Sequence, residues 1–257
     1  MSDPQQLRAK LVEMSRALGE PAADCVILGE GNTSARIDEE TFWVKASGAQ
    51  LPTITAEGFV RVRFAPVLEL LDLENPSDET IEQVLLEACV DNEAGQRPSI
   101  EALMHALLLQ EPGVNFVGHT HPVAVNAIVC SQRAEEAISG RLFPDEIVCC
   151  GIAPAWVPYT DPGVPLARQV AQSVRDYEET YGECPRAIWM QNHGLIALGA
   201  TAQGVQTVTA MSVKVARILI GTYALGGPHF LSDEQVERIA TRPDELSRQN
   251  RLGLTRS

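Results

Sequence analysis

Residues 117–122 read VGHTHP and carry two of the five histidines of this 257-residue chain. The surrounding segment, VNFVGHTHPVAV, is rich in β-type residues, so we expect His119 and His121 at a strand end or in an adjoining turn. Residues two apart in an extended segment project from the same face, so both imidazoles can reach one cation. The alternative is a pair of unrelated surface histidines, since two imidazoles buried side by side are costly unless they share a partner.

A third histidine lies at a similar place. His193 is the centre of an Asn-His-Gly turn within the apolar segment 186–198, which suits a buried strand that delivers a ligand at its end. Catalytic zinc usually has three protein ligands and an open position, so His193 is the candidate third ligand. A hydrogen-bonded core histidine is the alternative. His105 follows Glu101 by one helical turn and is expected to be structural, whereas His229 is expected at the surface.

The rest of the sequence predicts alternating strands and helices. Residues 25–64 contain short β-type runs broken by glycine, and residues 60–64 alternate apolar and basic side chains. Start and stop signals predict helices at 4–18 after an Asp3 N-cap, around 81–89, at 98–110, at 202–225 after Thr201, and after a capping box at Ser232. We find no repeat or linker, so residues 1–257 are expected to form one domain with a C-terminal helical extension from about residue 228.

The composition excludes several classes of protein. With 45% hydrophobic residues the chain can bury a large core, and its formal charge of −14 has the wrong sign for general binding to nucleic acid or anionic membranes. We find no signal-peptide pattern and no membrane-length apolar run, so a cytoplasmic protein is expected. The six cysteines contain no C-x-x-C pair and are expected to be reduced; a thiolate metal site is the alternative.

Six ordered motifs together resemble the class II aldolase/adducin family, typified by L-fuculose-1-phosphate aldolase. They are GEGNTSARI, VKASG, PSIEALMHAL, VGHTHP, VPYTDPG and QNHGLIALG, and they extend from about Cys25 to about Leu225. Within the family, FWVKASGAQL and SIEALMHAL look most like the aldolase domain of bifunctional rhamnulose-1-phosphate aldolase/dehydrogenase proteins, whose dehydrogenase half has no counterpart here. The resemblance implies an α/β fold, a three-layer α/β/α sandwich with a central, mainly antiparallel sheet. It also implies a homotetramer with sites at subunit interfaces.

The resemblance further implies roles for individual residues. His119, His121 and His193 would bind Zn²⁺ or another divalent cation such as Mn²⁺ or Co²⁺, and Glu101 would be the general acid/base. Tyr159 would protonate the departing half of the substrate, often in a neighbouring subunit's site. These roles suit a retro-aldol cleavage, because a Lewis-acid cation stabilises the negative charge of an enediolate and a nearby carboxylate can move the proton.

A sugar or sugar-phosphate substrate is expected, with the phosphate held by glycine- and serine-bearing motifs. Glycines let backbone amides approach an anion, and a helix start favours negative charge. The residues implied are Gly31, Asn32, Ser47, Gly48 and Ser99, the last of which we place at a helix start. Ile100 stands where the fuculose-type pattern has a second serine, so one hydroxyl donor is lost, and Lys45 or Arg97 could supply compensating charge.

Three functions therefore remain in view. The leading one is a metal-dependent aldolase that cleaves a ketose, by preference a ketose 1-phosphate. A dehydratase, decarboxylase or epimerase could use the same metal site, although the epimerases of this family have aspartate where Glu101 stands. A non-catalytic scaffold like the adducin head is the third possibility, but the metal histidines are missing there and all three are present here.

Overall fold

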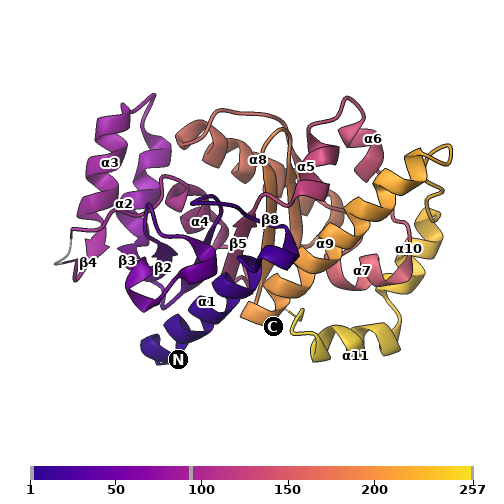
Figure 1. Ribbon diagram of the computed structural model, residues 1–257, viewed down its shortest axis with the longest axis horizontal. Helices are drawn as coiled ribbons and strands as arrows, with labels where there is room; N and C mark the ends of the chain where they lie inside the picture. Colours follow the sequence, from indigo (N-terminus) through magenta and orange to yellow (C-terminus); the bar gives the residue numbers. More distant parts are fainter. Residues whose placement is uncertain (1–2, 93–94, 256–257) are drawn as a thin grey trace.

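A computed structural model describes residues 3–92 and 95–255. In this part of the chain the strands form one eight-stranded sheet in the order β4-β3-β2-β1-β5-β8-β7-β6 (Figure 1). The strands are β1 (Asn32–Arg36), β2 (Thr41–Lys45), β3 (Phe59–Arg63), β4 (Cys89–Val90), β5 (Phe116–Thr120), β6 (Ala155–Val157), β7 (Ala187–Met190) and β8 (Gly194–Gly199).

The sheet is mixed. Neighbouring strands from β4 across to β7 run antiparallel, whereas β6 and β7 run parallel. Parallel neighbours need a long crossover, which here is the helix α8 (Val164–Tyr181). The predicted α/β class is confirmed, and the expectation of a mainly antiparallel sheet is corrected to a mixed one.

Helices cover both faces of the sheet and make three layers (Figure 1). The core on one face includes residues of α2 (Phe64–Glu69), α3 (Asp78–Glu87), α4 (Ala102–Leu108) and α8. The core on the other face includes residues of α1 (Pro4–Leu18), α5 (Val123–Val129), α6 (Ala134–Ile138), α7 (Pro144–Cys150) and α9 (Ala202–Tyr223). The helices α10 (Asp233–Ala240) and α11 (Pro243–Arg251) pack against α7. No helix of the described residues is long and apolar enough to cross a membrane.

The central strands alternate between the two cores, as strand geometry requires. In β8, Ile196 and Leu198 belong to the core with α4 and α8, while Leu195 and Ala197 belong to the core with α9. Since both faces of β8 are buried, its sequence is a continuous apolar run and not an alternating one.

Several helix starts lie where their caps predicted them. Asp3 accepts a hydrogen bond from the backbone of Gln5, and Thr201 accepts one from Gly204. Ser232 forms the predicted capping box with Gln235. These local signals are sufficient because each cap is satisfied by residues within its own first turn.

The helix predicted at 98–110 begins later, at Ala102, and ends at Leu108. Its first residues are held by the sheet instead: Ala46 and Pro98 form a β-bridge, and the Ser99 backbone N–H donates to Lys45 O at 3.2 Å. Glu101 is therefore the N-cap residue of α4, and Ser99 lies before the helix and not at its start.

Candidate metal centre

Three neighbouring segments of the sheet carry the three histidines. His119 is in β5, between β1, where it pairs with Asn32, and β8, where it pairs with Ile196. His121 follows the end of β5, and its backbone N–H donates to Cys25 O at 2.8 Å. His193 lies in the tight turn from β7 to β8.

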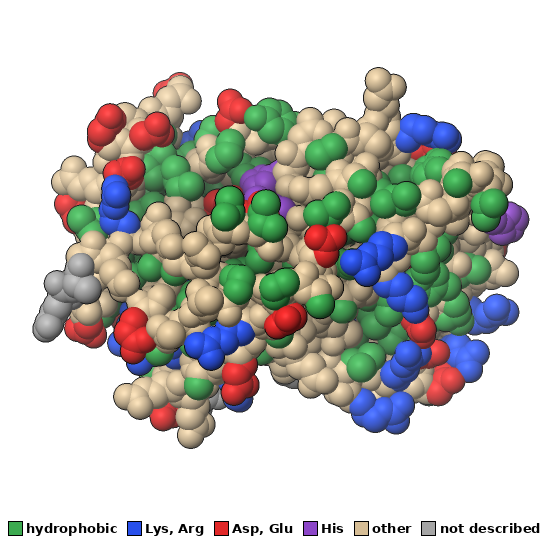
Figure 2. Space-filling view, viewed as in Figure 1, with side chains coloured by type: hydrophobic (Ala, Val, Ile, Leu, Met, Phe, Trp, Pro, Cys, Tyr) green, Lys and Arg blue, Asp and Glu red, His purple; other side chains and the backbone are tan. Residues whose placement is uncertain are grey.

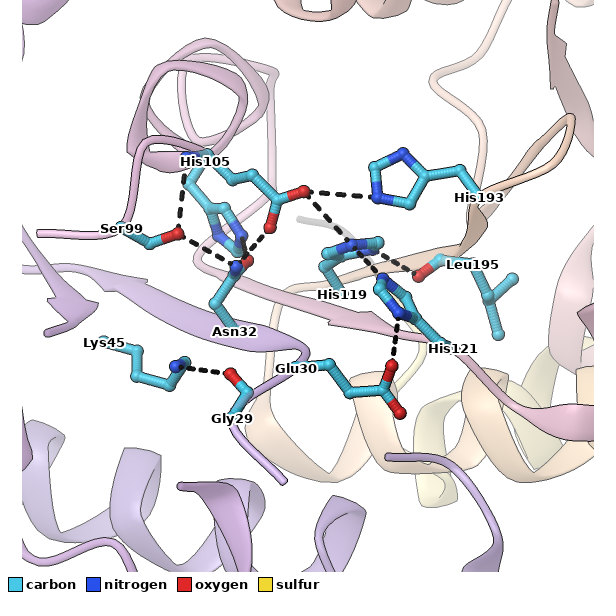
Figure 3. Close-up of polar contacts among 11 residues, drawn as sticks. Gly29, Glu30, Asn32, Lys45, Ser99, His105, His119, His121, His193 and Leu195 are labelled. Carbon is cyan, nitrogen blue, oxygen red and sulfur yellow. Dashed lines mark hydrogen bonds and ion pairs between the residues drawn. The ribbon is translucent and has the colours of Figure 1, made fainter. Parts of the chain in front are cut away.

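The structure brings these three side chains together. The His119 and His121 Nε2 atoms are 2.9 Å apart, and one ligand atom from each of the three histidines lies within 4.8 Å of the others. The rings point toward a common centre (Figure 3). His119 is fully buried, whereas His121 and His193 keep 21% and 15% of their side chains exposed. Histidine side chains are visible in a hollow near the middle of the face drawn in Figure 2, so the centre is reachable from solvent.

When His119 and His121 are neutral, the tautomers implied by their outer hydrogen bonds leave nitrogen lone pairs at this centre. His119 Nδ1 lies 3.0 Å from Leu195 O, a carbonyl that can only accept, so Nδ1 carries the proton. His121 Nδ1 lies 2.8 Å from a carboxylate oxygen of Glu30, which gives the same tautomer. Two facing Nε2 lone pairs repel unless a cation lies between them. The donor set therefore fits a divalent cation, with imidazoles oriented by outer partners as in known metal sites.

Glu101 adds a negative charge to the same place. Its Oε1 atom lies 3.3 Å from His193 Nε2 and 3.5 Å from His119 Nε2. Before a cation binds, burial opposes the protonation of His119, but Glu101 raises the pKa of His119 above its usual value, so His119 can be protonated. Burial favours the neutral acid at Glu101, but the charge of this protonated His119 and hydrogen bonds from His119, His193 and Asn32 hold the pKa of Glu101 well below its usual range. Glu101 is thus a carboxylate at neutral pH. Burial and then the charge of His119 lower the pKa of His121 to about 4, so this ring is neutral and can ligate.

A buried network fixes the other oxygen of Glu101. The Asn32 side-chain NH₂ group donates to Glu101 Oε2, and the Asn32 side-chain oxygen accepts a hydrogen bond from His105 Nε2. His105 Nδ1 lies 2.7 Å from Ser34 Oγ, and burial lowers the pKa of His105 to about 3. His105 is fully buried and away from the ligand atoms, which agrees with the structural role expected for it.

Lys45 lies near this network with little exposure. Its ammonium group donates to Ala49 O at 2.7 Å and to Gly29 O at 3.2 Å, and the residue is 3% exposed. Burial lowers the pKa of Lys45, while the charge of Glu101 opposes that shift. Lys45 therefore places a buried basic group within electrostatic range of Glu101.

The residues expected around a phosphate are divided between this network and the surface. Ser99 Oγ accepts hydrogen bonds from the Asn32 amide at 3.3 Å and from the Glu101 backbone at 3.4 Å. Gly31 precedes Asn32 and lies against His119 O, so both belong to the network. Ser47 and Gly48 are exposed in the loop after β2. One residue from each group, Ser47 and Ser99, lines a cavity of about 320 Å³ together with Glu82, Leu85, Arg97, Pro98 and Ile100.

Tyr159 is not brought to the histidines. It is 55% exposed, and its hydroxyl donates to Asp161 at 3.1 Å. Its backbone N–H donates to the side chain of Gln191 at 3.0 Å, which ties the loop to the segment that carries His193. Within the described residues, no recorded contact joins the Tyr159 hydroxyl to the three histidines.

Glu30 is a polar residue of this centre that sequence reasoning missed. Its only signal is an acidic residue between two glycines, Gly29 and Gly31, directly before a predicted strand. Such a pattern is ordinary for a turn, and the partner, His121, is 91 residues away in the sequence.

Comparison with known proteins agrees with this fold. The family model described as "Class II Aldolase and Adducin N-terminal domain" matches residues 9–220. An uncharacterized oxidoreductase, YuxG, of Bacillus subtilis (strain 168) is 30% identical over 202 residues, which are 76% of this chain and 27% of that protein. The chain thus spans about a quarter of the length of this relative.

Solved structures share the architecture at low identity. An L-fuculose 1-phosphate aldolase superposes with a TM-score of 0.69 at 18% identity, covering 93% of this chain and 96% of the other. YgbL from Klebsiella pneumoniae, a candidate aldolase/epimerase/decarboxylase, superposes with a TM-score of 0.69 at 19% identity, covering 93% of this chain and 100% of the other. At these identities the likeness shows the fold alone.

Proposed function

The chain belongs to the class II aldolase and adducin family, and we propose that it is a divalent-metal-dependent lyase that cleaves a ketose by a retro-aldol reaction. The observation that carries this proposal is the convergence of three histidine ligand atoms within 4.8 Å of one another, with Glu101 Oε1 beside two of them. His119, His121 and His193 would hold the cation. The cation would be Zn²⁺, which suits three imidazoles, or another divalent cation such as Mn²⁺ or Co²⁺.

A divalent cation bound there supplies Lewis-acid stabilisation of the negative charge that develops on the substrate during cleavage. Glu101 supplies the proton transfer. Its low pKa makes it a carboxylate, and Asn32 holds Oε2, so Oε1 is the atom that accepts and returns the proton. The reaction balances within the substrate: a hydroxyl loses a proton, the carbon–carbon bond breaks to give an aldehyde, and the ketone fragment regains a proton at carbon.

Tyr159 completes the proposal as the hydroxyl that hydrogen-bonds the oxygen of the departing aldehyde half; it gives that oxygen a proton only in the reverse, condensation direction, so the proton balance of cleavage is unchanged. Because its hydroxyl is exposed and turned to Asp161, we assign it to the site of a neighbouring subunit in a homotetramer. This assignment makes activity depend on assembly. Dilution that dissociates the oligomer should therefore remove turnover while metal stays bound.

We assign the phosphate of a ketose 1-phosphate to the cavity beside Ser99. Its lining offers the hydroxyls of Ser47 and Ser99 and the guanidinium of Arg97, which is positioned to offset the serine lost at Ile100. Arginine and hydroxyl donors are the usual partners of phosphate.

Product analysis tests the proposed function. We would incubate the metal-loaded protein, and the same protein stripped with a chelator, with L-rhamnulose 1-phosphate, L-fuculose 1-phosphate and the free sugars, and follow the products by NMR. Two carbonyl fragments that form only with metal support the aldolase. Loss of water or CO₂ would instead assign a dehydratase or decarboxylase, and inversion at one carbon an epimerase. No conversion by a metal-loaded protein would overturn the proposal.

A further inference from the structure

Glu30 is held at both carboxylate oxygens by different parts of the chain. Its Oε1 accepts the backbone N–H of Ile27 at 2.7 Å, and its Oε2 lies 2.8 Å from His121 Nδ1 (Figure 3). The first contact closes the turn at residues 27–30. The second joins that turn to a histidine of the metal centre, so the carboxylate is fixed before any ligand arrives.

The turn is attached to the metal-bearing strand at both of its ends. Cys25 O accepts the His121 backbone N–H at 2.8 Å, and Asn32 pairs with His119 in the sheet. Gly31 has φ +71°, and a Cβ there would lie 2.9 Å from His119 O, so the chain passes very close to β5. Residues 25–32 therefore form a bridge over the end of β5, with Glu30 as its side-chain contact to the site.

The side chains at the tip of this bridge add little to hold it. Ile27 is 67% exposed and Leu28 is 77% exposed, and Leu28 has φ +52°, which is unfavourable for a branched residue. Cys25 and Val26 are buried in the core, so only the tip at residues 27–30 lacks apolar packing. The tip is held by polar contacts: those of the Glu30 side chain, the Glu30 backbone N–H to Ile27 O at 3.2 Å, and the Lys45 ammonium to Gly29 O at 3.2 Å. The contact to His121 is the one that reports on the metal centre.

The three histidines have unequal outer partners. His119 Nδ1 faces the neutral carbonyl of Leu195, whereas His121 Nδ1 faces the carboxylate of Glu30. A carboxylate behind an imidazole fixes its tautomer and raises its basicity as a ligand. Of these two outer partners only Glu30 is charged, and Glu30 together with Glu101 supplies two negative charges to balance a divalent cation.

We propose that Glu30 is a positioning residue that sets the metal affinity of the centre formed by His119, His121 and His193, and that metal binding in turn orders the bridge at residues 25–32. The proposal rests on the proposed metal site. A bound cation draws electron density from His121 and makes its Nδ1–H a better donor to Glu30. The same contact therefore transmits metal occupancy to the bridge.

Metal affinity measured by competition with a chromophoric chelator tests this, with Zn²⁺ as the probe and the Co²⁺ absorption spectrum as a second readout. Glu30→Gln should weaken Zn²⁺ binding about 10–100-fold, the usual effect of losing an outer partner of a metal-bound histidine. Glu30→Asp keeps the negative charge, but its shorter side chain cannot reach His121 Nδ1, so it should weaken Zn²⁺ binding to a similar extent. This second variant provides the test if Glu30→Gln folds poorly.

Asp24→Asn is the matched control. Asp24 is an acidic residue directly before the same bridge, but among the described residues its side chain forms no hydrogen bond with His121. Its φ of +54° is tolerated by asparagine, so the substitution should not strain the backbone. The Zn²⁺ affinity of Asp24→Asn should stay within about threefold of that of the unaltered protein, a smaller change than the loss of an outer partner of a metal-bound histidine causes. Hydrogen exchange at residues 25–32 should slow on adding Zn²⁺ to the unaltered protein, and slow less in Glu30→Gln.

The outcomes separate the two proposals. If the unaltered protein binds Zn²⁺ and both Glu30 variants bind it equally well, the role of Glu30 is wrong and the metal site stands. An equal loss in Asp24→Asn would show general electrostatics in place of a specific contact, which also overturns the proposal. Absence of Zn²⁺ binding by the unaltered protein would overturn the metal site itself.

Discussion

At position 194, only glycine allows the turn that carries His193 to approach His121. A Cβ there would lie 2.6 Å from Thr120 O and 2.8 Å from His121 Cδ2, and the first of these is backbone that cannot move aside. We predict that Gly194→Ala lowers the free energy of unfolding by about 1–3 kcal/mol, as overpacking usually does, and weakens Zn²⁺ binding. Denaturant unfolding and chelator competition measure the two effects.

Gly221→Ala is the control for that prediction. Gly221 lies within α9, and a Cβ added there would have nothing within 4 Å, so alanine should raise stability by up to about 1 kcal/mol. A Gly194→Ala protein as stable and as metal-avid as the original would show that the turn can relax.

Removal of one ligand should abolish metal binding without unfolding the chain. His121 follows the end of β5 and keeps 21% of its side chain exposed, so its loss opens no buried cavity. We predict that His121→Ala retains the far-UV circular dichroism of the original and loses the cation found by elemental analysis. His229→Ala changes a histidine outside the centre and should keep the full metal content. Full metal occupancy in His121→Ala would contradict its assignment as a ligand.

How far residues could be assigned from the sequence depends on the distance to their partners. The two-residue spacing of His119 and His121 was enough to predict a shared face, because strand geometry is local. Glu30 could not be found in that way, because its partner lies 91 residues away and only the folded sheet brings them together.

At the scale of elements, α3 reaches the proposed phosphate cavity through Glu82, which lines it. Glu82 of α3 forms an ion pair with Arg97 at 2.6 Å, and both side chains are more than half exposed. Exposed pairs of this kind are worth about 0–1 kcal/mol, so Arg97 can exchange Glu82 for a substrate phosphate.

We therefore predict opposite effects from the two partners. Arg97→Gln should raise KM for a ketose 1-phosphate about tenfold or more, the usual worth of a hydrogen bond to a charged group, with kcat little changed. Glu82→Gln should lower the same KM about two- to fivefold by releasing Arg97. Steady-state kinetics with the phosphorylated and free sugars measures both effects, and the free sugar should respond to neither change.

Arg242→Gln, in the exposed pair with Asp244, is the control for removing a surface arginine and should leave KM unchanged. Equal KM values for Glu82→Gln, Arg97→Gln and the original would remove Arg97 from the phosphate site.

Helices with self-contained caps were predicted well, and elements shaped by tertiary contacts were not. The starts of α1, α9 and α10 follow from Asp3, Thr201 and Ser232, each of which caps its own first turn. The late start of α4 results from the isolated β-bridge pairing of Ala46 with Pro98, which no local sequence pattern predicts. Residues 147–150, Ile-Val-Cys-Cys, are also typical of a strand, but in the structure they form the last turn of α7.

For the whole molecule, metal binding should be linked to folding stability. The three ligands come from β5 and from the turn between β7 and β8, so the site exists only when these strands are paired. We predict that Zn²⁺ at 100 times its dissociation constant stabilises the native state by about 2.7 kcal/mol and raises the melting temperature by several degrees. Thermal unfolding with Zn²⁺ and with chelator measures the shift.

His193→Ala should unfold at the same temperature with and without Zn²⁺, because the site then lacks one of its ligands. A shift in His193→Ala equal to that of the original would place the stabilising metal elsewhere on the protein.

The strands at the two edges of the sheet are very short, since β4 has two residues and β6 has three. Short edges present few unpaired backbone groups, so another chain finds little template for adding a strand. We therefore expect copies of this protein that associate to do so mainly through helices and loops. The same feature should protect concentrated solutions against edge-to-edge aggregation, even though the interior strands are strongly apolar.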